Sequence, residues 1–149
     1  MLTKELLSIK EMYRIDQLAS KGSITNLGLM ENAGKKVLEE ILKRYNKRPV
    51  LILCGPGKNG GDGFVIARLL KELEWPVRLT VITKKQKNFE SIKNAELWNG
   101  SIEHADVSLL NRNLLVIDAM FGAGLSRPLD GIALKLVETI NKKKIECIA

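Results

Sequence analysis

PVLILCGPGKNGGDGF, residues 49–64, is the stretch that decides the fold. Its opening apolar run, bounded by proline and glycine, predicts a parallel strand over 49–55 that is buried on both faces. Gly55, Gly57 and Gly60 satisfy the pattern G-x-G-x-x-G, in which glycine permits a tight turn and lets backbone N–H groups approach an anion. The apolar spacing after the loop predicts a helix that begins at Gly63. A strand, a glycine loop and a helix in this order favour a ligand site at the carboxyl ends of the strands of an open α/β sheet.

The rest of the chain alternates strands and helices. Predicted strands cover 77–83, 114–120 and the start of one at 145–149; predicted helices cover 5–20 (ended by Gly22), 25–45 (capped by Thr25 or Asn26), 63–74, 86–98 and about 129–141. The helix 86–98 is expected to make its apolar contacts through Phe89, Ile92, Leu97 and Trp98, and 99–112 supports only a short strand or turn. The pattern predicts the α/β class: one Rossmann-like domain over residues 1–149, with three αβα layers and a mainly parallel sheet.

Composition narrows the function. The 149 residues carry a net charge of +7, but the basic clusters 43–48, 84–87 and 142–144 lie at the ends of predicted elements and contain a single aromatic residue, Tyr45, so we do not expect nucleic-acid binding. No apolar run is long enough for a membrane span, and the first residues do not resemble a signal peptide, so we expect a cytoplasmic protein. Cys54 and Cys147 lie in apolar stretches and are expected to be buried and unpaired.

The glycine loop differs from two common nucleotide-binding loops. Gly61 and Asp62 stand where a P-loop has Lys and Ser or Thr, and no acid follows the strand 77–83 to hold a ribose hydroxyl. NTP hydrolysis and ordinary hydride transfer are therefore disfavoured. Asn59 and Asp62 can hydrogen-bond a ligand or offer oxygen atoms to a hard cation, although Asp62 can also simply cap the helix predicted from Gly63.

A second candidate site follows the strand 114–120. Asp118 is a carboxylate near the end of this buried strand, where it needs a donor, a cation or a substrate hydroxyl as partner. In the loop after it, Gly122, Gly124, Ser126 and Arg127 can bind phosphate. His104, Trp75 and Trp98 are interpreted as a surface residue and two packing residues.

Four motifs in order, EMYRIDQLASKG (11–22), GLMENAG (28–34), GPGKNGGDGF (55–64) and VIDAMFGAGL (116–125), resemble the NAD(P)H-hydrate epimerase family, also called the YjeF N-terminal domain family. The resemblance implies a Rossmann-like homodimer that interconverts the R and S forms of hydrated NADH and NADPH, called NADHX and NADPHX. A partner ATP- or ADP-dependent dehydratase, fused behind this domain in many bacteria, then repairs the pool.

The resemblance also implies site residues. One substrate loop falls on Lys58, Asn59, Gly60, Gly61 and Asp62, and a second on Gly122, Ala123, Gly124, Leu125, Ser126, Arg127 and Pro128. Asn59 and Asp118 match ligands of a potassium ion. Epimerisation needs an acid/base group, and Asp62 and Asp118 are the catalytic candidates, with their roles unassigned.

The chain departs from the family pattern twice. Lys58 stands where the family has a neutral Asn. In the family, a strand like 145–149 is followed by an Asp and a Pro-Ser-Gly turn, whereas the given sequence ends at Ala149, so we expect a domain without its C-terminal part. Two alternatives to the epimerase stay open: a non-catalytic ligand-binding or dimerising scaffold of the same fold, which includes an inactive fragment of a bifunctional enzyme, and a generic NAD-dependent oxidoreductase.

Overall fold

The computed structural model describes residues 6–21, 25–83 and 85–149, so the predictions that concern Glu5, Gly22 and Lys84 lie outside the described residues. The described chain forms one five-stranded sheet in the order β3-β2-β1-β4-β5, and all four pairs of neighbouring strands are parallel. The strands are β1 (Val50–Cys54), β2 (Val77–Val81), β3 (Ile102–His104), β4 (Leu115–Ala119) and β5 (Glu146–Ile148).

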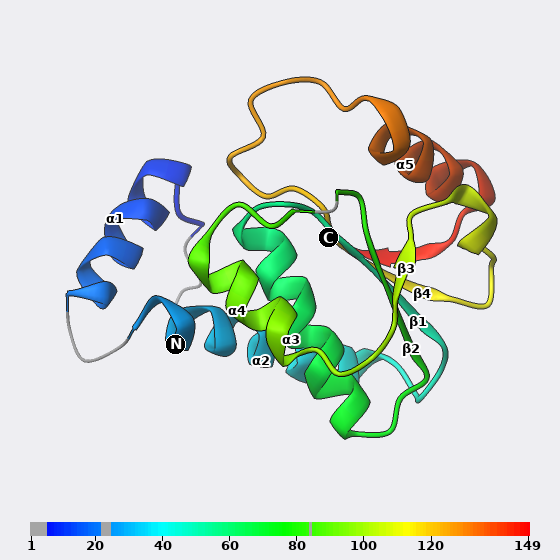
Figure 1. Ribbon diagram of the computed structural model, residues 1–149, viewed down its shortest axis with the longest axis horizontal. Coiled ribbons are helices and arrows are strands. Elements are labelled where there is room, and N and C mark those ends of the chain that lie inside the picture. Colours follow the sequence, from blue (N-terminus) through cyan, green and yellow to red (C-terminus); the bar gives the residue numbers. More distant parts are fainter. Residues whose placement is uncertain (1–5, 22–24, 84) are drawn as a thin grey trace.

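Helices cover both faces of this sheet (Figure 1). One face packs against α3 (Lys58–Glu72), with α2 (Asn26–Arg44) and α4 (Phe89–Leu97) lying against α3. The other face packs against α5 (Gly131–Lys143) and the short 3-10 helix η1 (Val107–Leu109). The predicted Rossmann-like, three-layer α/β class is confirmed.

The core is continuous on each face of β1. Ile52 and Phe64 contribute to the cluster on the α3 side, and Leu51 and Leu136 to the cluster on the α5 side. Every residue of β1 is fully buried, as the continuous apolar run predicted. Trp75 and Trp98 are also buried, which confirms that they are packing residues.

The first helix, α1 (Ile9–Ser20), begins later than the predicted range, because Ser8 and Glu11 form a capping box. Its apolar side chains are not packed into the core. Ile9, Met12, Ile15 and Leu18 are exposed. The amphipathic spacing therefore predicted the helix but not its burial.

The prediction for the apolar contacts of residues 86–98 was right for Trp98, which is buried, and wrong for the three other residues. Phe89, Ile92 and Leu97 are exposed, while Ser91 and Asn94 are buried. The physical reason is a pair of polar contacts: the Ser91 hydroxyl donates to the Gly57 carbonyl oxygen at 2.9 Å, and the Asn94 amide donates to the Glu90 carbonyl oxygen at 3.0 Å. Hydrogen bonding makes these polar side chains suitable for burial.

The two cysteines differ from each other. Cys54 is buried and its thiol pKa is raised by burial, whereas Cys147 is exposed, which contradicts its predicted burial. The reason is position: Cys147 lies on β5, which pairs only with β4 among the described strands. Both cysteines are free thiols.

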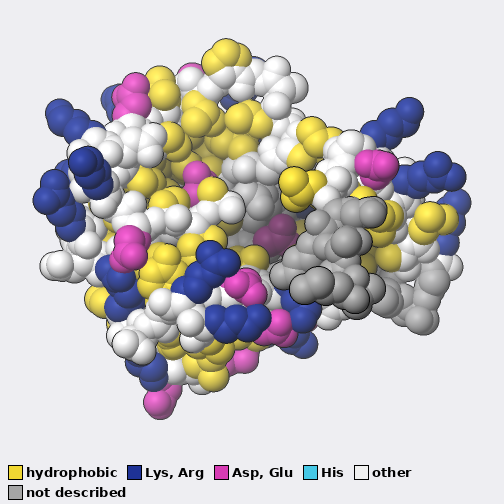
Figure 2. All heavy atoms as spheres, turned by 180° about the vertical axis from the view of Figure 1, so that it is seen from behind, with side chains coloured by type: hydrophobic (Ala, Val, Ile, Leu, Met, Phe, Trp, Pro, Cys, Tyr) yellow, Lys and Arg dark blue, Asp and Glu magenta, His cyan; other side chains and the backbone are white. Residues whose placement is uncertain are grey.

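The surface carries its charge in a mixed pattern. On the face drawn in Figure 2, Lys and Arg side chains are spread around the margin with Asp and Glu side chains among them. His104 is exposed, as predicted. Within residues 6–21, 25–83 and 85–149, no helix is long and apolar enough to cross a bilayer.

Candidate functional site

Two loops leave the sheet side by side, because β1 and β4 are adjacent parallel strands. The Gly55 N–H donates to the Ala119 carbonyl oxygen at 3.0 Å, so this strand pair continues one residue beyond β1. A methyl group on Gly55 would come within 1.6 Å of the Met120 carbonyl oxygen. The loop after β1 and the loop after β4 therefore begin in contact, at the edge of the sheet where α/β proteins bind ligands.

The helix after β1 begins five residues earlier than the sequence predicted. α3 begins at Lys58, and its N-cap is Gly57, which makes no side-chain capping bond. Asp62 lies inside the helix, so the alternative in which Asp62 caps a helix from Gly63 is wrong. Lys58, Asn59, Gly60, Gly61 and Asp62 all lie in the first turns of α3. The predicted substrate loop is therefore the N-terminal part of a helix.

The glycines serve close packing rather than a tight turn. Gly57 has an ordinary extended backbone, and the one glycine of the described chain in the left-handed region is Gly131. A methyl group would come within 1.9 Å of the Gly55 carbonyl oxygen at Gly60, within 2.6 Å of the Met30 and Ser91 side chains at Gly61, and within 2.7 Å of Cys54 and Ala119 at Gly63. These three glycines let α3 lie directly against the sheet, α2 and α4.

Asp62 has an unusual environment for a carboxylate. It is half-buried, and no hydrogen bond or ion pair of its side chain occurs among the residues that the structure describes. Burial raises its pKa to about 7, while the Lys58 ammonium opposes this shift and the Asp16 carboxylate on α1 adds to it. A group with this pKa can both release and accept a proton near neutral pH.

Asn59 connects the two loops. The side chain of Asn59 lies against Gly122, whose missing Cβ would be 3.6 Å from the Asn59 Cβ and 4.0 Å from its Oδ1. The structure thus brings together the Lys58–Asp62 segment and the start of the Gly122–Pro128 loop. The rest of this loop is exposed, and the Arg127 guanidinium forms an ion pair with Asp130 at 2.9 Å.

Asp118 is half-buried at the end of β4. Its Oδ1 accepts the Met120 N–H at 3.0 Å. Burial raises the pKa of Asp118, and this hydrogen bond opposes the shift. Its side chain has no ion pair within the described ranges. The carboxylate keeps one oxygen available for a ligand.

The donor set is compatible with potassium. Asn59 and Asp118 offer an amide oxygen and a carboxylate oxygen, the atoms that hard cations prefer. The described residues contain no cluster of three or more His, Cys, Asp or Glu side chains suited to a transition metal. The two side chains thus offer oxygen donors of the kind that a hard cation takes.

Four residues near the site were not singled out from the sequence as site residues. Ser91 holds the loop after β1 through Gly57, and the Lys87 N–H donates to the Pro56 carbonyl oxygen at 2.8 Å. Tyr13 and Asp16 approach from α1, near Gly124 and Asp62. The only available signal was that α1 carries the motif EMYRIDQLASKG, which included both residues without giving them a role.

Comparison with known proteins identifies relatives of the chain. The family model described as YjeF-related protein N-terminus matches residues 26–149. The chain is 36% identical to an NAD(P)H-hydrate epimerase of Rhodobacter capsulatus, over 85% of this chain and 66% of that protein. It is 37% identical to a bifunctional NAD(P)H-hydrate repair enzyme Nnr of Methanocaldococcus jannaschii, over 95% of this chain and 31% of that protein.

A solved structure has the same fold. The crystal structure of yeast ynu0, YNL200c, aligns with a TM-score of 0.75 at 23% identity, over 96% of this chain and 68% of the yeast chain. The chain thus spans about two thirds of the length of the epimerase and of the yeast protein, and less than a third of the bifunctional enzyme. The matched family model and the shared fold together show that the chain belongs to the family of YjeF-related protein N-termini.

Proposed function

We propose that this chain is an isomerase that interconverts the R and S forms of NADHX and NADPHX in nicotinamide nucleotide repair. The proposal draws on relatives whose names state this epimerase or repair activity. The observation that carries it for this chain is the environment of Asp62, a half-buried carboxylate without a hydrogen-bond partner in the described chain and with a pKa of about 7.

The chemistry explains why such a group is suitable. The hydrated ring is a carbinolamine, and its epimers exchange by loss and return of the hydroxyl group or by ring opening and closure. Either route moves a proton to and from an oxygen atom. A carboxyl group with a pKa near the working pH is present in both protonation states and transfers protons most effectively. Asp62 therefore is the leading acid/base candidate, and Asp118 is the second.

Binding groups surround Asp62. The first turns of α3 offer free backbone N–H groups and the Lys58 ammonium, both of which favour a negatively charged ligand. Gly122–Pro128 offers further exposed backbone groups that begin beside Asn59. A dinucleotide carries two phosphates, so these two segments are the proposed substrate-binding residues. Lys58 adds a cation where the family has an amide, which favours binding of a phosphate.

We also propose that Asn59 and Asp118 hold a potassium ion. The proposal is supported by their oxygen donors and by the absence of a cationic side chain paired with Asp118 in the described ranges. A bound potassium ion would supply positive charge that stabilises the ionised form of Asp118. Asn59 would at the same time keep the start of α3 next to Gly122.

Three further properties are also proposed. A dehydratase that consumes one epimer is the functional partner, and a cytoplasmic location suits that pairing. A homodimer is favoured by the exposed apolar side chains of α1, which resemble the side chains that interfaces cover. The same apolar face would also serve the alternative function, a dimerising scaffold without catalysis.

The test is epimer exchange. Purified NADHX or NADPHX enriched in one epimer is incubated with the chain at a pH where spontaneous exchange is slow, and the epimers are separated by chromatography. We expect accelerated exchange by the wild-type chain and loss of acceleration in Asp62→Asn. A scaffold would bind without accelerating exchange, and this outcome would contradict the isomerase.

A further inference from the structure

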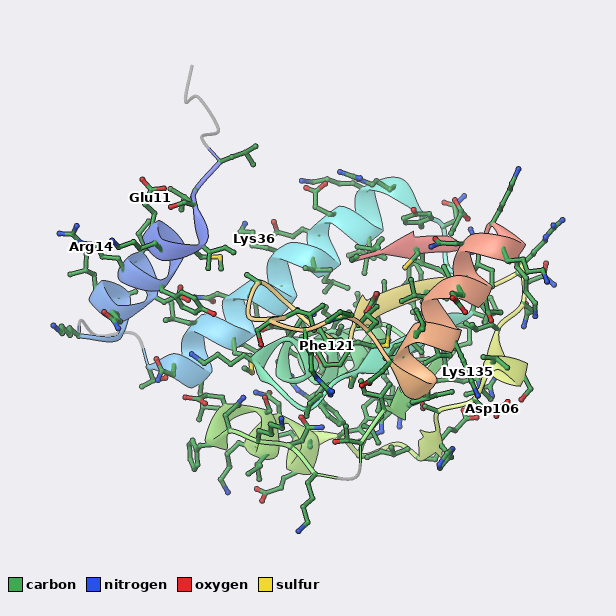
Figure 3. All side chains as sticks on the ribbon, turned by 90° about the horizontal axis from the view of Figure 1, so that it is seen from above. Glu11, Arg14, Lys36, Asp106, Phe121 and Lys135 are labelled. Atoms are coloured by element: carbon green, nitrogen blue, oxygen red, sulfur yellow. The ribbon has the colours of Figure 1, made fainter. Side chains whose placement is uncertain are left out.

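Helix α1 lies beside the two loops without being part of the packed core. It contacts α2, and four of its apolar side chains are exposed. Figure 3 shows that Glu11 and Arg14 project from the side of α1 that is turned away from the rest of the chain. The opposite side of the helix therefore faces the loops.

Two polar side chains lie on this inner side. The Tyr13 hydroxyl oxygen is 3.5 Å from the position that a Cβ of Gly124 would take, so the phenol lies against the second loop. Asp16, three residues later, is on the same face of the helix and lies close enough to Asp62 to affect its charge. The inner side of α1 thus meets both loops, one through each residue.

Simple packing does not explain this arrangement. A helix that merely covered the domain would bury its apolar side chains, whereas the apolar side chains of α1 are exposed, and Tyr13 and Asp16 are exposed beside the loops, where a ligand can reach them. Neither side chain makes a hydrogen bond or ion pair within residues 6–21, 25–83 and 85–149. Two carboxylates brought near each other, Asp16 and Asp62, are unfavourable unless a donor lies between them.

We propose that α1 forms the third side of the substrate site and that Tyr13 and Asp16 are substrate-contacting residues, which hydrogen-bond hydroxyl groups of the hydrated dinucleotide. The inference rests on the proposed function and adds a specificity role for α1. A tyrosine hydroxyl donates and accepts, and an ionised carboxylate accepts two or more hydrogen bonds, so the pair suits a ribose diol or the ring hydroxyl of the hydrate.

The test compares three variants of the 149-residue chain. Tyr13→Phe and Asp16→Asn each remove one hydrogen-bonding group with almost no change in size. Arg14→Gln is the matched control, because it removes a polar group from the outer side of the same helix. We expect Tyr13→Phe and Asp16→Asn to raise the KM for NADHX about 3- to 10-fold, with kcat changed less than about 3-fold, and Arg14→Gln to match the wild type.

A second measurement separates the role of α1 in binding from the epimerase activity. Equilibrium dialysis with NADHX measures binding without turnover, and circular dichroism confirms that each variant is folded. If the wild type exchanges epimers but Tyr13→Phe and Asp16→Asn behave like Arg14→Gln, the role of α1 is wrong and the epimerase stands. If the wild type binds NADHX without exchange and the two variants bind more weakly, the role of α1 stands and the epimerase is wrong. A wild type that does not bind NADHX overturns both.

Discussion

Gly60 lies so close to Gly55 that a methyl group on Gly60 would come within 1.9 Å of the Gly55 carbonyl oxygen. That oxygen belongs to the backbone just after β1, so it cannot rotate away, and a side chain would push α3 off the sheet. We expect Gly60→Ala to lower the free energy of unfolding by about 3 kcal/mol. Gly57→Ala is the control, because no atom lies within 4 Å of its missing Cβ, and it should change by less than about 1 kcal/mol. Urea denaturation of both variants gives these values, and equal losses would contradict the packing role.

The ionised Asp62 carboxylate is expected to lower the free energy of unfolding above neutral pH. Its pKa of about 7 exceeds the ordinary value of about 3.9, so the folded chain binds this proton more tightly than the unfolded chain. The contribution of this group to the free energy of unfolding is therefore fully present below about pH 4 and is lost as the pH rises through 7. We expect Asp62→Asn to be more stable than the wild type at pH 8 by roughly 1 to 3 kcal/mol and equal near pH 4.

The same variant should lose its acceleration of epimer exchange by about 100-fold or more. Asp106→Asn is the control, because the pKa of the exposed Asp106 carboxyl is shifted in the opposite direction: hydrogen bonds from Ser108 lower it. This variant should be no more stable than the wild type at pH 8 and fully active. An Asp62→Asn chain that is less stable at pH 8, or that keeps its activity, would show that Asp62 is an ordinary structural residue.

Potassium should stabilise the folded chain through Asn59 and Asp118. A ligand that binds only the folded state raises stability by mass action, and near-saturating potassium is expected to raise the melting temperature by about 3 to 6 °C. Tetramethylammonium chloride at equal concentration controls for ionic strength. We expect the shift to vanish in Asn59→Ala and Asp118→Ala, followed by differential scanning fluorimetry. An equal shift in both variants would exclude these two residues as ligands.

Alanine substitutions at two neighbouring residues of α4 should lower stability more at the polar residue than at the apolar one. Ser91 is buried and its hydroxyl donates to the Gly57 carbonyl oxygen, whereas Ile92 is exposed. We expect Ser91→Ala to lower the free energy of unfolding by about 1 kcal/mol and Ile92→Ala by less than about 0.5 kcal/mol. Chemical denaturation measures both, and a larger loss for Ile92 would mean that α4 packs by its apolar side after all.

Local patterns predicted most of the fold. The apolar run of β1 and the alternation of strands and helices identified the layers, because burial on both faces requires continuous apolar residues. The start of α3 was placed five residues late, since Gly60, Gly61 and Gly63 are poor helix formers and only tertiary contact explains them. The prediction of the buried face of α4 was wrong because a hydrogen bond to a distant loop decides the burial of Ser91, and hydropathy contains no such information.

The candidate site was predicted in its parts but not in its assembly. The motifs identified Asp62, Asn59 and Asp118 as candidates, whereas the pairing of β1 with β4, which brings their loops together, is a finding of the structure. The approach of α1 was beyond prediction, because Tyr13 and Asp16 reach the site through the path of the chain before α2 rather than through any local pattern.

The central claim is that the site around Asp62 interconverts the epimers of hydrated nicotinamide dinucleotides. The most direct measurement is the rate of NADHX epimer exchange with the wild-type chain and with Asp62→Asn, at pH 8 and in the presence of potassium. We expect clear acceleration by the wild type and at least about a 100-fold smaller effect of the variant. An exchange rate with the folded wild-type chain that equals the spontaneous rate would contradict it.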